Sequence, residues 1–235
     1  AFSCIITIMK ISVVIPALNE EKLLPHTLAS LKALDRTPDE ILVIDASSTD
    51  NTVAVAQKAG AKVITVPKGT IGFSRQKGIE SAAGDVIAFT DADAVLPHDW
   101  LNRIERALSK PNVVGYFGGF RVFDGPPFYR FYINVIQPIV NRLMFFLFRI
   151  PMATGQNMAF YKKTALEVGG IPTNYRMAED IEIARRLMMA GRIVFTQREY
   201  VTASGRRGFE KGLFLRVFKV FILYFLFHKA DTIGF

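Results

Sequence analysis

Short apolar runs alternate with amphipathic stretches along the first half of the chain. The apolar runs are rich in β-branched residues, which predicts strands, and the stretches between them have the spacing of helices. The predicted strands are residues 11–15, 40–44, 62–66 and 85–90, and the predicted helices are residues 19–34, 50–59 and 74–83. Strands that alternate with helices form right-handed βαβ units, so this half predicts an α/β fold with a mostly parallel sheet.

The pattern becomes mixed in the second half. Residues 113–120 predict a strand in which glycines allow close approach of another backbone. Residues 164–168 and 181–190 predict two further helices. Residues 155–160 fit either a substrate-facing segment or a tight turn that leads into a strand.

Residues 127–150 are strongly aromatic and aliphatic, but polar residues and a proline interrupt them. The interrupting residues are Arg130, Asn134, Gln137, Pro138, Asn141, Arg142 and Arg149. These interruptions argue against a simple lipid-exposed span and favour helices that lie along a membrane interface. A proline inside a helix removes a hydrogen bond, so Pro138 is expected to divide or kink the segment.

The end of the chain, residues 208–235, is both basic and apolar. Lys211, Arg216 and Lys219 lead into the uncharged run 220–227, which is only eight residues long. A bilayer span needs about 20 residues, so an amphipathic helix anchored among lipid headgroups is the favoured interpretation. A core helix packed on the rest of the protein is the alternative.

The composition limits the class of protein. The 235 residues fit one domain with a modest appendage, and the formal net charge of +8 indicates an anionic partner. A single cysteine excludes an internal disulfide framework. No nucleic-acid recognition module is visible, so nucleic acid is not an expected partner. Residues 1–8, which precede Met9, lack a basic region typical of a signal peptide, so the catalytic part is expected on the cytoplasmic side of a membrane.

Polar residues follow the predicted strands where ligands bind in parallel sheets, at the strands' carboxyl ends. Glu20 follows the first strand, Asp45 the second, and the pair Asp91 and Asp93 the fourth. Two carboxylates separated by one residue suit Mg²⁺ or Mn²⁺, which can bridge the phosphates of a nucleotide and stabilise a leaving diphosphate. An isolated pair of this kind is also common in solvated turns.

Several motifs occur together and in order. They are residues 14–20 (VIPALNE), residues 43–50 (VIDASSTD), Arg75 at the start of a predicted helix, the pair Asp91 and Asp93, and the pair Glu179 and Asp180. This combination, which spans about residues 10–207, resembles the family 2 glycosyltransferases with the Rossmann-like GT-A fold. The resemblance implies a metal-dependent hexosyltransferase that uses Mn²⁺ or Mg²⁺.

The resemblance also implies roles on the donor side. The backbone of Pro16 and Ala17 would form the nucleoside-binding edge, and Glu20 would accept a hydrogen bond from a ribose hydroxyl. Asp45 would bind the base, although a turn residue is the alternative, and Asp50 is expected to be only a helix N-cap. The remaining donor-side roles are that Arg75 steadies Asp91 or a phosphate, Asp91 meets the ribose or the metal, and Asp93 binds the metal.

On the acceptor side, the resemblance makes Asp180 the general base of an inverting transfer, with Glu179 in support. Acids in a first helical turn also simply favour the helix dipole, so this pair alone would not identify a base. Arg206 and Arg207 would lie near the diphosphate, and a basic patch beside a membrane is the alternative. The Gln and Trp of the motif found at this place in processive relatives are missing, which makes processive polymerisation doubtful.

Among its relatives the chain is most similar to a small membrane-associated archaeal mannosyltransferase with a minimal cellulose-synthase-like fold. This implies GDP-mannose as the favoured donor, with a UDP-sugar also possible, and a lipid-linked acceptor such as a dolichol-linked glycan. A polyprenyl-phosphate sugar synthase and a non-catalytic nucleotide-sugar-binding membrane protein are the alternatives. The expected organisation is a donor half (10–126), interface helices (127–150), an acceptor half (151–207) and a membrane-associated tail (208–235).

Overall fold

The computed structural model describes residues 9–175 and 177–206 of the chain. The strands are β1 (Ile11–Ala17), β2 (Glu40–Asp45), β3 (Lys62–Thr65), β4 (Val86–Phe89), β5 (Ala94–Val95), β6 (Val113–Val122), β7 (Met158–Tyr161) and β8 (Arg192–Ala203). The helices are α1 (Leu24–Lys32), α2 (Thr52–Lys58), α3 (Ile71–Ser81), α4 (Trp100–Leu108), α5 (Pro127–Phe131), α6 (Gln137–Phe148), α7 (Lys162–Glu167) and α8 (Glu179–Ala190), with a π-helical segment η1 (Tyr132–Ile136) between α5 and α6.

All of these strands belong to one sheet in the order β3-β2-β1-β4-β7-β6-β8-β5. Strands β1 to β4 are parallel, as predicted. Strand β7 is antiparallel to both of its neighbours, β8 runs parallel to β6, and the short β5 pairs antiparallel with β8. The α/β fold is therefore confirmed, with a mixed sheet in which parallel pairs predominate. The long strand β8 was not predicted.

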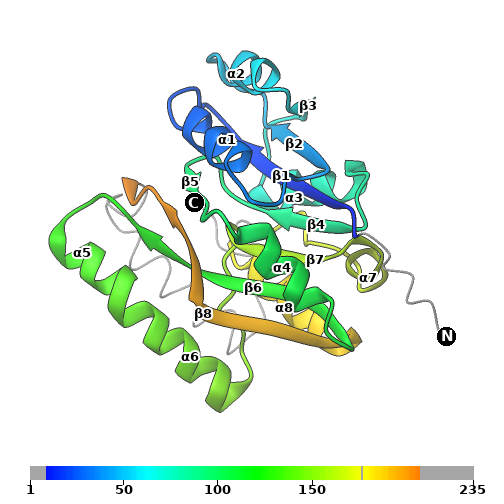
Figure 1. The fold of residues 1–235 in the computed structure, drawn as a ribbon, viewed down its shortest axis with the longest axis vertical. Helices are drawn as coiled ribbons and strands as arrows, with labels where there is room; N and C mark the ends of the chain where they lie inside the picture. Colours follow the sequence, from blue (N-terminus) through cyan, green and yellow to red (C-terminus); the bar gives the residue numbers. More distant parts are fainter. Residues whose placement is uncertain (1–8, 176, 207–235) are drawn as a thin grey trace.

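Helices cover both faces of the sheet (Figure 1). On one face, α1 and α4 pack against β1 through Leu28, Trp100 and Leu101, all nearly or fully buried. On the other face, α3, α7 and α8 pack through Ile79, Ala165 and Ile183. This three-layer core exposes the carboxyl ends of β1, β2 and β4 to the region where the predicted site residues lie.

Two predicted helices begin elsewhere in the structure. The helix predicted from residue 19 begins at Leu24, because the Glu20 carbonyl accepts the amides of Leu23 and Leu24 in a turn before it. Helix α3 begins at Ile71, three residues earlier than predicted, because the Thr70 side chain caps it by accepting the Phe73 N–H. Arg75 therefore lies in the second turn of α3 and not at its start.

Helices α5, η1 and α6 form one continuous helical segment. Pro138 was expected to divide or kink the segment. The structure has a π-helical turn directly before it, where the Gln137 N–H donates to the Tyr132 carbonyl. A proline has no N–H to donate, so a local widening of the helix accommodates it without a break. Among the described residues, Pro127–Phe148 is the one helix long and apolar enough to cross a membrane by length and composition alone.

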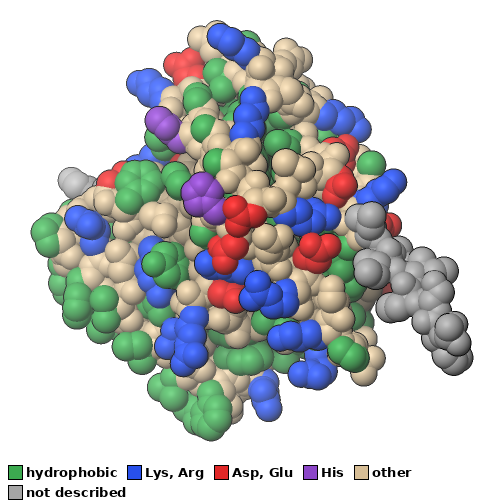
Figure 2. Space-filling view, viewed as in Figure 1, with side chains coloured by type: hydrophobic (Ala, Val, Ile, Leu, Met, Phe, Trp, Pro, Cys, Tyr) green, Lys and Arg blue, Asp and Glu red, His purple; other side chains and the backbone are tan. Residues whose placement is uncertain are grey.

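Two polar residues of this helical segment, Asn134 and Asn141, face the sheet. Asn134 pairs with both backbone groups of Val122, at 2.8 and 3.0 Å, and Asn141 approaches the buried Gln197. The opposite side exposes apolar side chains, which we call the apolar helix face: Phe128, Phe131, Val135, Ile139, Val140, Leu143, Phe146, Leu147 and Phe148. Figure 2 shows apolar side chains along the left and lower edge of the molecule, where Figure 1 draws α5 and α6.

The four-part organisation stays a prediction. Its first and third parts both contribute strands to one continuous sheet. The predicted tail, residues 208–235, and Arg207 lie outside the described residues.

Candidate active site

Arg75 is the centre of a buried ionic network that joins three elements. It projects from α3 with only 4% of its surface exposed. One guanidinium nitrogen donates to Asp91 Oδ1 at 3.0 Å, after β4, and the other donates to Glu179 Oε1, at the start of α8. Burial alone would lower the pKa of Arg75, but the carboxylates of Asp91, Glu179 and Asp180 raise it, so the arginine stays charged. Contact with Asp91 is one of the two roles expected of Arg75, and the contact with Glu179 was not predicted.

Asp180 is held beside this network by backbone amides. The Gly155 N–H donates to Asp180 Oδ2 at 2.9 Å, and the Ile181 N–H donates to Oδ1 at 2.8 Å. The residue before the pair, Ala178, has a left-handed backbone with φ of 65°. Such strained conformations persist only where the surrounding structure holds them, and they concentrate at functional sites. The start of α8 therefore fixes the carboxylate of Asp180 at the surface of the ionic network.

Gly155 packs directly against the guanidinium of the buried Arg75. A β-carbon at this position would overlap with the Arg75 guanidinium. The glycine thus brings its N–H to Asp180 and lets the backbone cross over Arg75. Of the two interpretations of residues 155–160, the structure shows a turn that leads into β7, and its first residue contacts the candidate base.

The acidic pair at the start of α8 is electrostatically strained. Burial raises the pKa of Glu179, and repulsion from Asp180 raises it further, while Arg75 acts in the opposite direction. Burial also raises the pKa of Asp180, against the effect of Arg75 and the two amide hydrogen bonds. A carboxylate with a raised pKa is a stronger base, which suits proton removal from a hydroxyl group.

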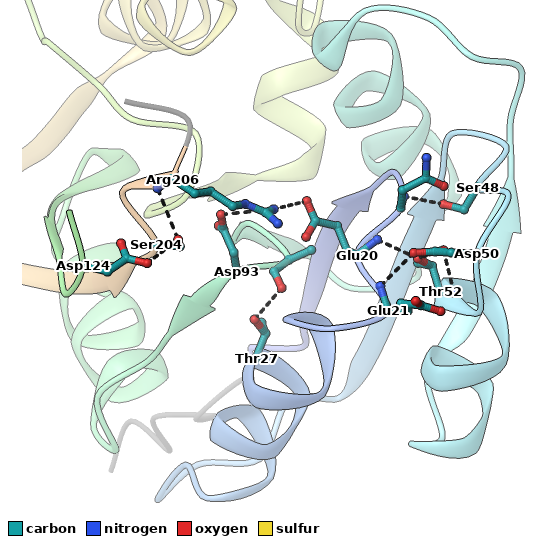
Figure 3. A network of polar contacts seen from close by, with 12 residues as sticks. Glu20, Glu21, Thr27, Ser48, Asp50, Thr52, Asp93, Asp124, Ser204 and Arg206 are labelled. Atoms are coloured by element: carbon teal, nitrogen blue, oxygen red, sulfur yellow. Dashed lines mark hydrogen bonds and ion pairs between the residues drawn. The ribbon is translucent and has the colours of Figure 1, made fainter. Parts of the chain in front are cut away.

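Glu20, Asp93 and Arg206 form a second ionic group on the donor side (Figure 3). Arg206 donates to Glu20 Oε1, and the same nitrogen lies 3.5 Å from Asp93 Oδ2. Glu20 was predicted to accept a hydrogen bond from ribose, and in this structure Arg206 holds one of its oxygens. The guanidinium of Arg206 therefore lies between the carboxylates predicted to bind nucleoside and metal.

Asp124 is a residue of this region that the sequence did not identify. Its carboxylate accepts the Ser204 hydroxyl at 2.9 Å and the Gly205 N–H, and so holds the segment that carries Arg206 (Figure 3). The signal available in the sequence was the run DGPP at residues 124–127, an acid and a turn directly after a strand.

The nucleoside edge is built mainly from backbone. Ala17 pairs with Asp45 across β1 and β2, and its carbonyl accepts the Ala46 N–H. Pro16 is one residue earlier in the same register. Asp45 is 1% exposed and accepts the Ser48 N–H at 3.1 Å, so it has the turn role given as its alternative.

Asp50 is not the helix N-cap, which is Asn51. Its carboxylate nevertheless accepts the Thr52 N–H at 3.0 Å and the Glu21 N–H at 3.1 Å. Asp50 therefore still satisfies an amide at the start of α2, and it also fixes the turn that carries Glu20. The prediction of a structural role was right, and the assigned position was wrong.

Asp91 and Asp93 fit a divalent cation as a partial ligand set. Both follow β4, and the Asp91 side chain is 30% exposed while that of Asp93 is 10% exposed. Residues 9–175 and 177–206 contain no group of three acidic, histidine or cysteine side chains that could hold a metal ion. Hard oxygens from a diphosphate and water commonly complete the coordination of Mg²⁺ in such sites.

Sequence comparison identifies the family. Residues 12–170 match the model of glycosyl transferase family 2, and the chain therefore belongs to this family. A glycosyltransferase of Mycobacterium bovis, itself uncharacterized, is 36% identical over 100 residues, which cover 43% of this chain and 44% of that protein. Glucosyl-3-phosphoglycerate synthase of Mycobacterium tuberculosis is 35% identical over 97 residues, covering 37% and 30%. The matched segments span less than half the length of these curated relatives.

Solved structures show the same fold. A mannosyltransferase from Pyrobaculum calidifontis, in complex with GDP-Man and Mn²⁺, has a TM-score of 0.70 at 21% identity and covers 97% of this chain and 65% of its own. Glucosyl-3-phosphoglycerate synthase from Mycobacterium tuberculosis, in complex with Mn²⁺, UDP and its product, has a TM-score of 0.67 at 22% identity, with 92% and 79% coverage. The predicted GT-A fold is thereby confirmed.

Proposed function

We propose that this protein is an inverting, metal-dependent glycosyltransferase that moves a hexose from a nucleotide sugar to a lipid-linked acceptor at a membrane. The observation that carries the proposal is the contact chain from Asp91 through Arg75 to Glu179, with Asp180 beside it. This chain joins the carboxylates suited to the donor to a partly exposed carboxylate suited to the acceptor.

The roles of the residues follow from their positions. Asp91 and Asp93 would hold Mn²⁺ or Mg²⁺, which supplies positive charge to the leaving diphosphate when bound. Asp180 takes the proton of the acceptor hydroxyl, whose oxygen forms a bond to the anomeric carbon. The bond from that carbon to the diphosphate breaks on the opposite side, and the electron pair leaves with the diphosphate oxygen. Arg206, beside Asp93, is placed to balance that charge.

GDP-mannose is the favoured donor in this proposal, and a UDP-sugar is the alternative. The archaeal mannosyltransferase structure with GDP-Man supports the first choice, because it has the highest coverage of this chain among the structures compared above. The synthase structure with UDP supports the second. The nucleoside edge at Ala17 is built mainly from backbone, which offers no side chain that would select one base over the other.

The apolar helix face supports a membrane-bound acceptor. Exposed apolar patches of this kind mark protein or membrane contacts, and a basic flank favours anionic lipid. Arg130, Arg142 and Arg149 are exposed on the same helical segment, and residues 125–166 contain no acidic residue. We place this face on the cytoplasmic side of a membrane.

The experiment is nucleoside diphosphate release by the full chain from a panel of GDP- and UDP-sugars, with Mn²⁺ or with a chelator. Lipid extract and 3-phosphoglycerate serve as alternative acceptors. We expect metal-dependent release from one donor, stimulated by lipid extract and abolished in Asp93→Asn and Asp180→Asn. Asp35→Asn, an exposed acid away from the site, is the matched control.

Each alternative has its own outcome. Stimulation by 3-phosphoglycerate alone would replace the lipid acceptor with a soluble one. Sugar transfer to polyprenyl phosphate itself would identify a polyprenyl-phosphate sugar synthase. Donor binding with no release from any donor would leave a non-catalytic nucleotide-sugar-binding protein.

A further inference from the structure

Arg121 is a fixed cation outside the candidate active site. It projects from β6, and its guanidinium donates to the Phe120 carbonyl at 2.7 Å and to the Gln197 carbonyl at 3.2 Å. The same guanidinium lies over the Tyr200 ring, 4.8 Å from the ring centre. These contacts hold the guanidinium in one orientation without neutralising its charge.

A second arginine approaches it from the helical segment. Arg142 of α6 is exposed, and its neighbour Asn141 points Nδ2 at Gln197 Oε1, 3.5 Å away. Arg121 and Asn141 therefore both bind Gln197, one through its backbone and the other through its side chain. Arg142 is the next residue of α6, so it lies on the helix that packs against β8 near Gln197.

This pair of cations has no carboxylate partner among residues 9–175 and 177–206. Neither arginine forms an ion pair there, in contrast to Arg75 and Arg206. Burial lowers the pKa of Arg121 and the charge of Arg142 lowers it further, while Tyr200 acts in the opposite direction. Two adjacent cations without an acid are unfavourable on their own and favour a bound anion.

The position of the pair indicates where the anion comes from. Arg142 is next to Leu143 of the apolar helix face, the exposed Phe123 directly follows β6, and the exposed Tyr200 lies on β8. Arginine and tyrosine at the border of an apolar surface are typical of the headgroup level of a bilayer. Guanidinium groups bind phosphate through paired hydrogen bonds.

We propose that Arg121, Arg142 and Tyr200 form a binding site for the phosphate group of a membrane lipid. This inference rests on the proposed function, in which the apolar helix face lies on the membrane. It makes the site the place where the phosphate of the lipid-linked acceptor docks.

The distance to the donor site then restricts the acceptor. Strand β8 is extended from Tyr200 to Ala203, a rise of about 10 Å, and only after it does Ser204 N–H reach the Asp93 carbonyl. The phosphate site and the donor site are therefore separated along β8. A lipid that carries sugar units between its phosphate and the accepting hydroxyl would bridge this separation.

The test is vesicle binding by the full chain and by Arg121→Gln, Arg142→Gln and the control Arg192→Gln, an exposed arginine at the other end of β8. The vesicles are phosphatidylcholine alone, with polyprenyl phosphate, or with oleate at matched surface charge. We expect about a tenfold loss of affinity for polyprenyl phosphate vesicles in each of the first two variants, the size expected when a hydrogen-bonded charge pair is lost. Arg192→Gln should bind all vesicles as wild type does. No variant should lose affinity for oleate vesicles relative to wild type.

Three results would overturn the inference. The first is an equal loss on oleate vesicles, which would show a general charge effect. The second is an equal loss in Arg192→Gln. The third is binding of soluble inorganic phosphate with no preference for vesicles, which would indicate a site for the free ion. Because Arg142 is exposed, its variant keeps the test valid if Arg121→Gln fails to fold. Nucleoside diphosphate release by wild type is measured separately, so a failure of the proposed transferase remains distinguishable from a failure of the phosphate site.

Discussion

The ionic network around Arg75 and the apolar helix face both differ from what stability alone would favour. One withdraws charge from water, and the other exposes apolar surface to it. Around Arg75, charge is withdrawn from water: Arg75 and Glu179 are buried, and Asp91 and Asp180 are half-buried beside them. On the apolar helix face, apolar groups are exposed, with 81% of Phe128 and 78% of Phe146 accessible. Burying charge is costly, and exposed apolar patches invite association.

The two regions are also held differently. Contacts between elements far apart in sequence over-determine the network, since 104 residues separate Arg75 from Glu179. The helical segment contacts the sheet through Asn134 and Asn141 and through the Phe145–Phe195 ring pair at 4.8 Å, among other contacts. In the proposed function, chemistry would occur in the ionic network and substrate delivery at the exposed apolar helix face. The predictions below separate these two roles.

Asp180→Asn should produce the largest effect, and it should be confined to catalysis. Removing a general base costs about 10²- to 10⁴-fold in rate, while the donor-side contacts of Asp91 and Arg75 remain. Steady-state kinetics should show a loss in kcat with little change in donor affinity or in vesicle binding. A comparable loss of donor binding would show that Asp180 belongs to the donor pocket and is not the base.

Gly155→Ala should come next, because it acts on geometry alone. A β-carbon here overlaps with the Arg75 guanidinium, so either the arginine or the amide that holds Asp180 must shift. Displacements of about 1 Å in a catalytic site cost roughly 100-fold. Gly69→Ala is the matched control, because a β-carbon there meets only ordinary contacts, the nearest at 3.5 Å. Equal activity of both variants would remove Gly155 and Arg75 from the positioning of the base.

Phe146→Ser should affect the other region only. Burial of a phenylalanine in an apolar phase is favourable by about 1.5–3 kcal/mol, so its loss should weaken vesicle binding roughly 10-fold or more. Nucleoside diphosphate release by hydrolysis of the donor, measured without lipid, should not change. Met189→Ser, a 79% exposed position on α8, is the control. If the two variants lose equal vesicle affinity, the apolar helix face is not the membrane contact.

The same contrast explains what could be predicted from the sequence. Strands β1, β2 and β4 were predictable because their apolar runs are largely buried, and β3, which is at best half-buried, because its central residues are β-branched. Strand β8 was not, since Gln197, Arg198 and Glu199 interrupt it, and of these only Gln197 is buried. The start of α3 was misplaced because the Thr70 cap was not recognised. The spacing of apolar residues reveals a strand only where one of its faces is clearly buried, and β8 is largely half-buried.

Candidate site residues were predicted where a motif names them, and their contacts were not. Arg206 was expected near a diphosphate, but its ion pair with Glu20 joins residues 186 positions apart. Asp124 was missed because an acid after a strand reads as a turn, and only the fold brings Ser204 and Gly205 to it. Arg121 gave no signal, because the absence of an acid beside it depends on how β6, β8 and α6 pack.

The smallest predicted effect concerns stability, and it tests whether the network is strained. The pKa of Asp180 is raised in the folded protein, so the folded state keeps the proton to higher pH than the unfolded state does. The wild-type chain therefore loses stability as pH rises from the unfolded pKa of an aspartate, about 4, through the folded value. Asp180→Asn cannot ionise, so it should avoid this loss.

The measurement is the thermal unfolding midpoint of wild type and Asp180→Asn across acidic to neutral pH. We expect the variant to gain relative to wild type as pH rises, and the gain to disappear below the ordinary range of carboxyl groups. The difference in unfolding midpoint between Phe146→Ser and wild type should not depend on pH, because no titratable group changes. A variant that is less stable than wild type at neutral pH would mean that the Gly155 and Ile181 amide bonds outweigh the burial of the charge. In that case the network would stabilise the fold, and the contrast with the apolar helix face would be one of function alone.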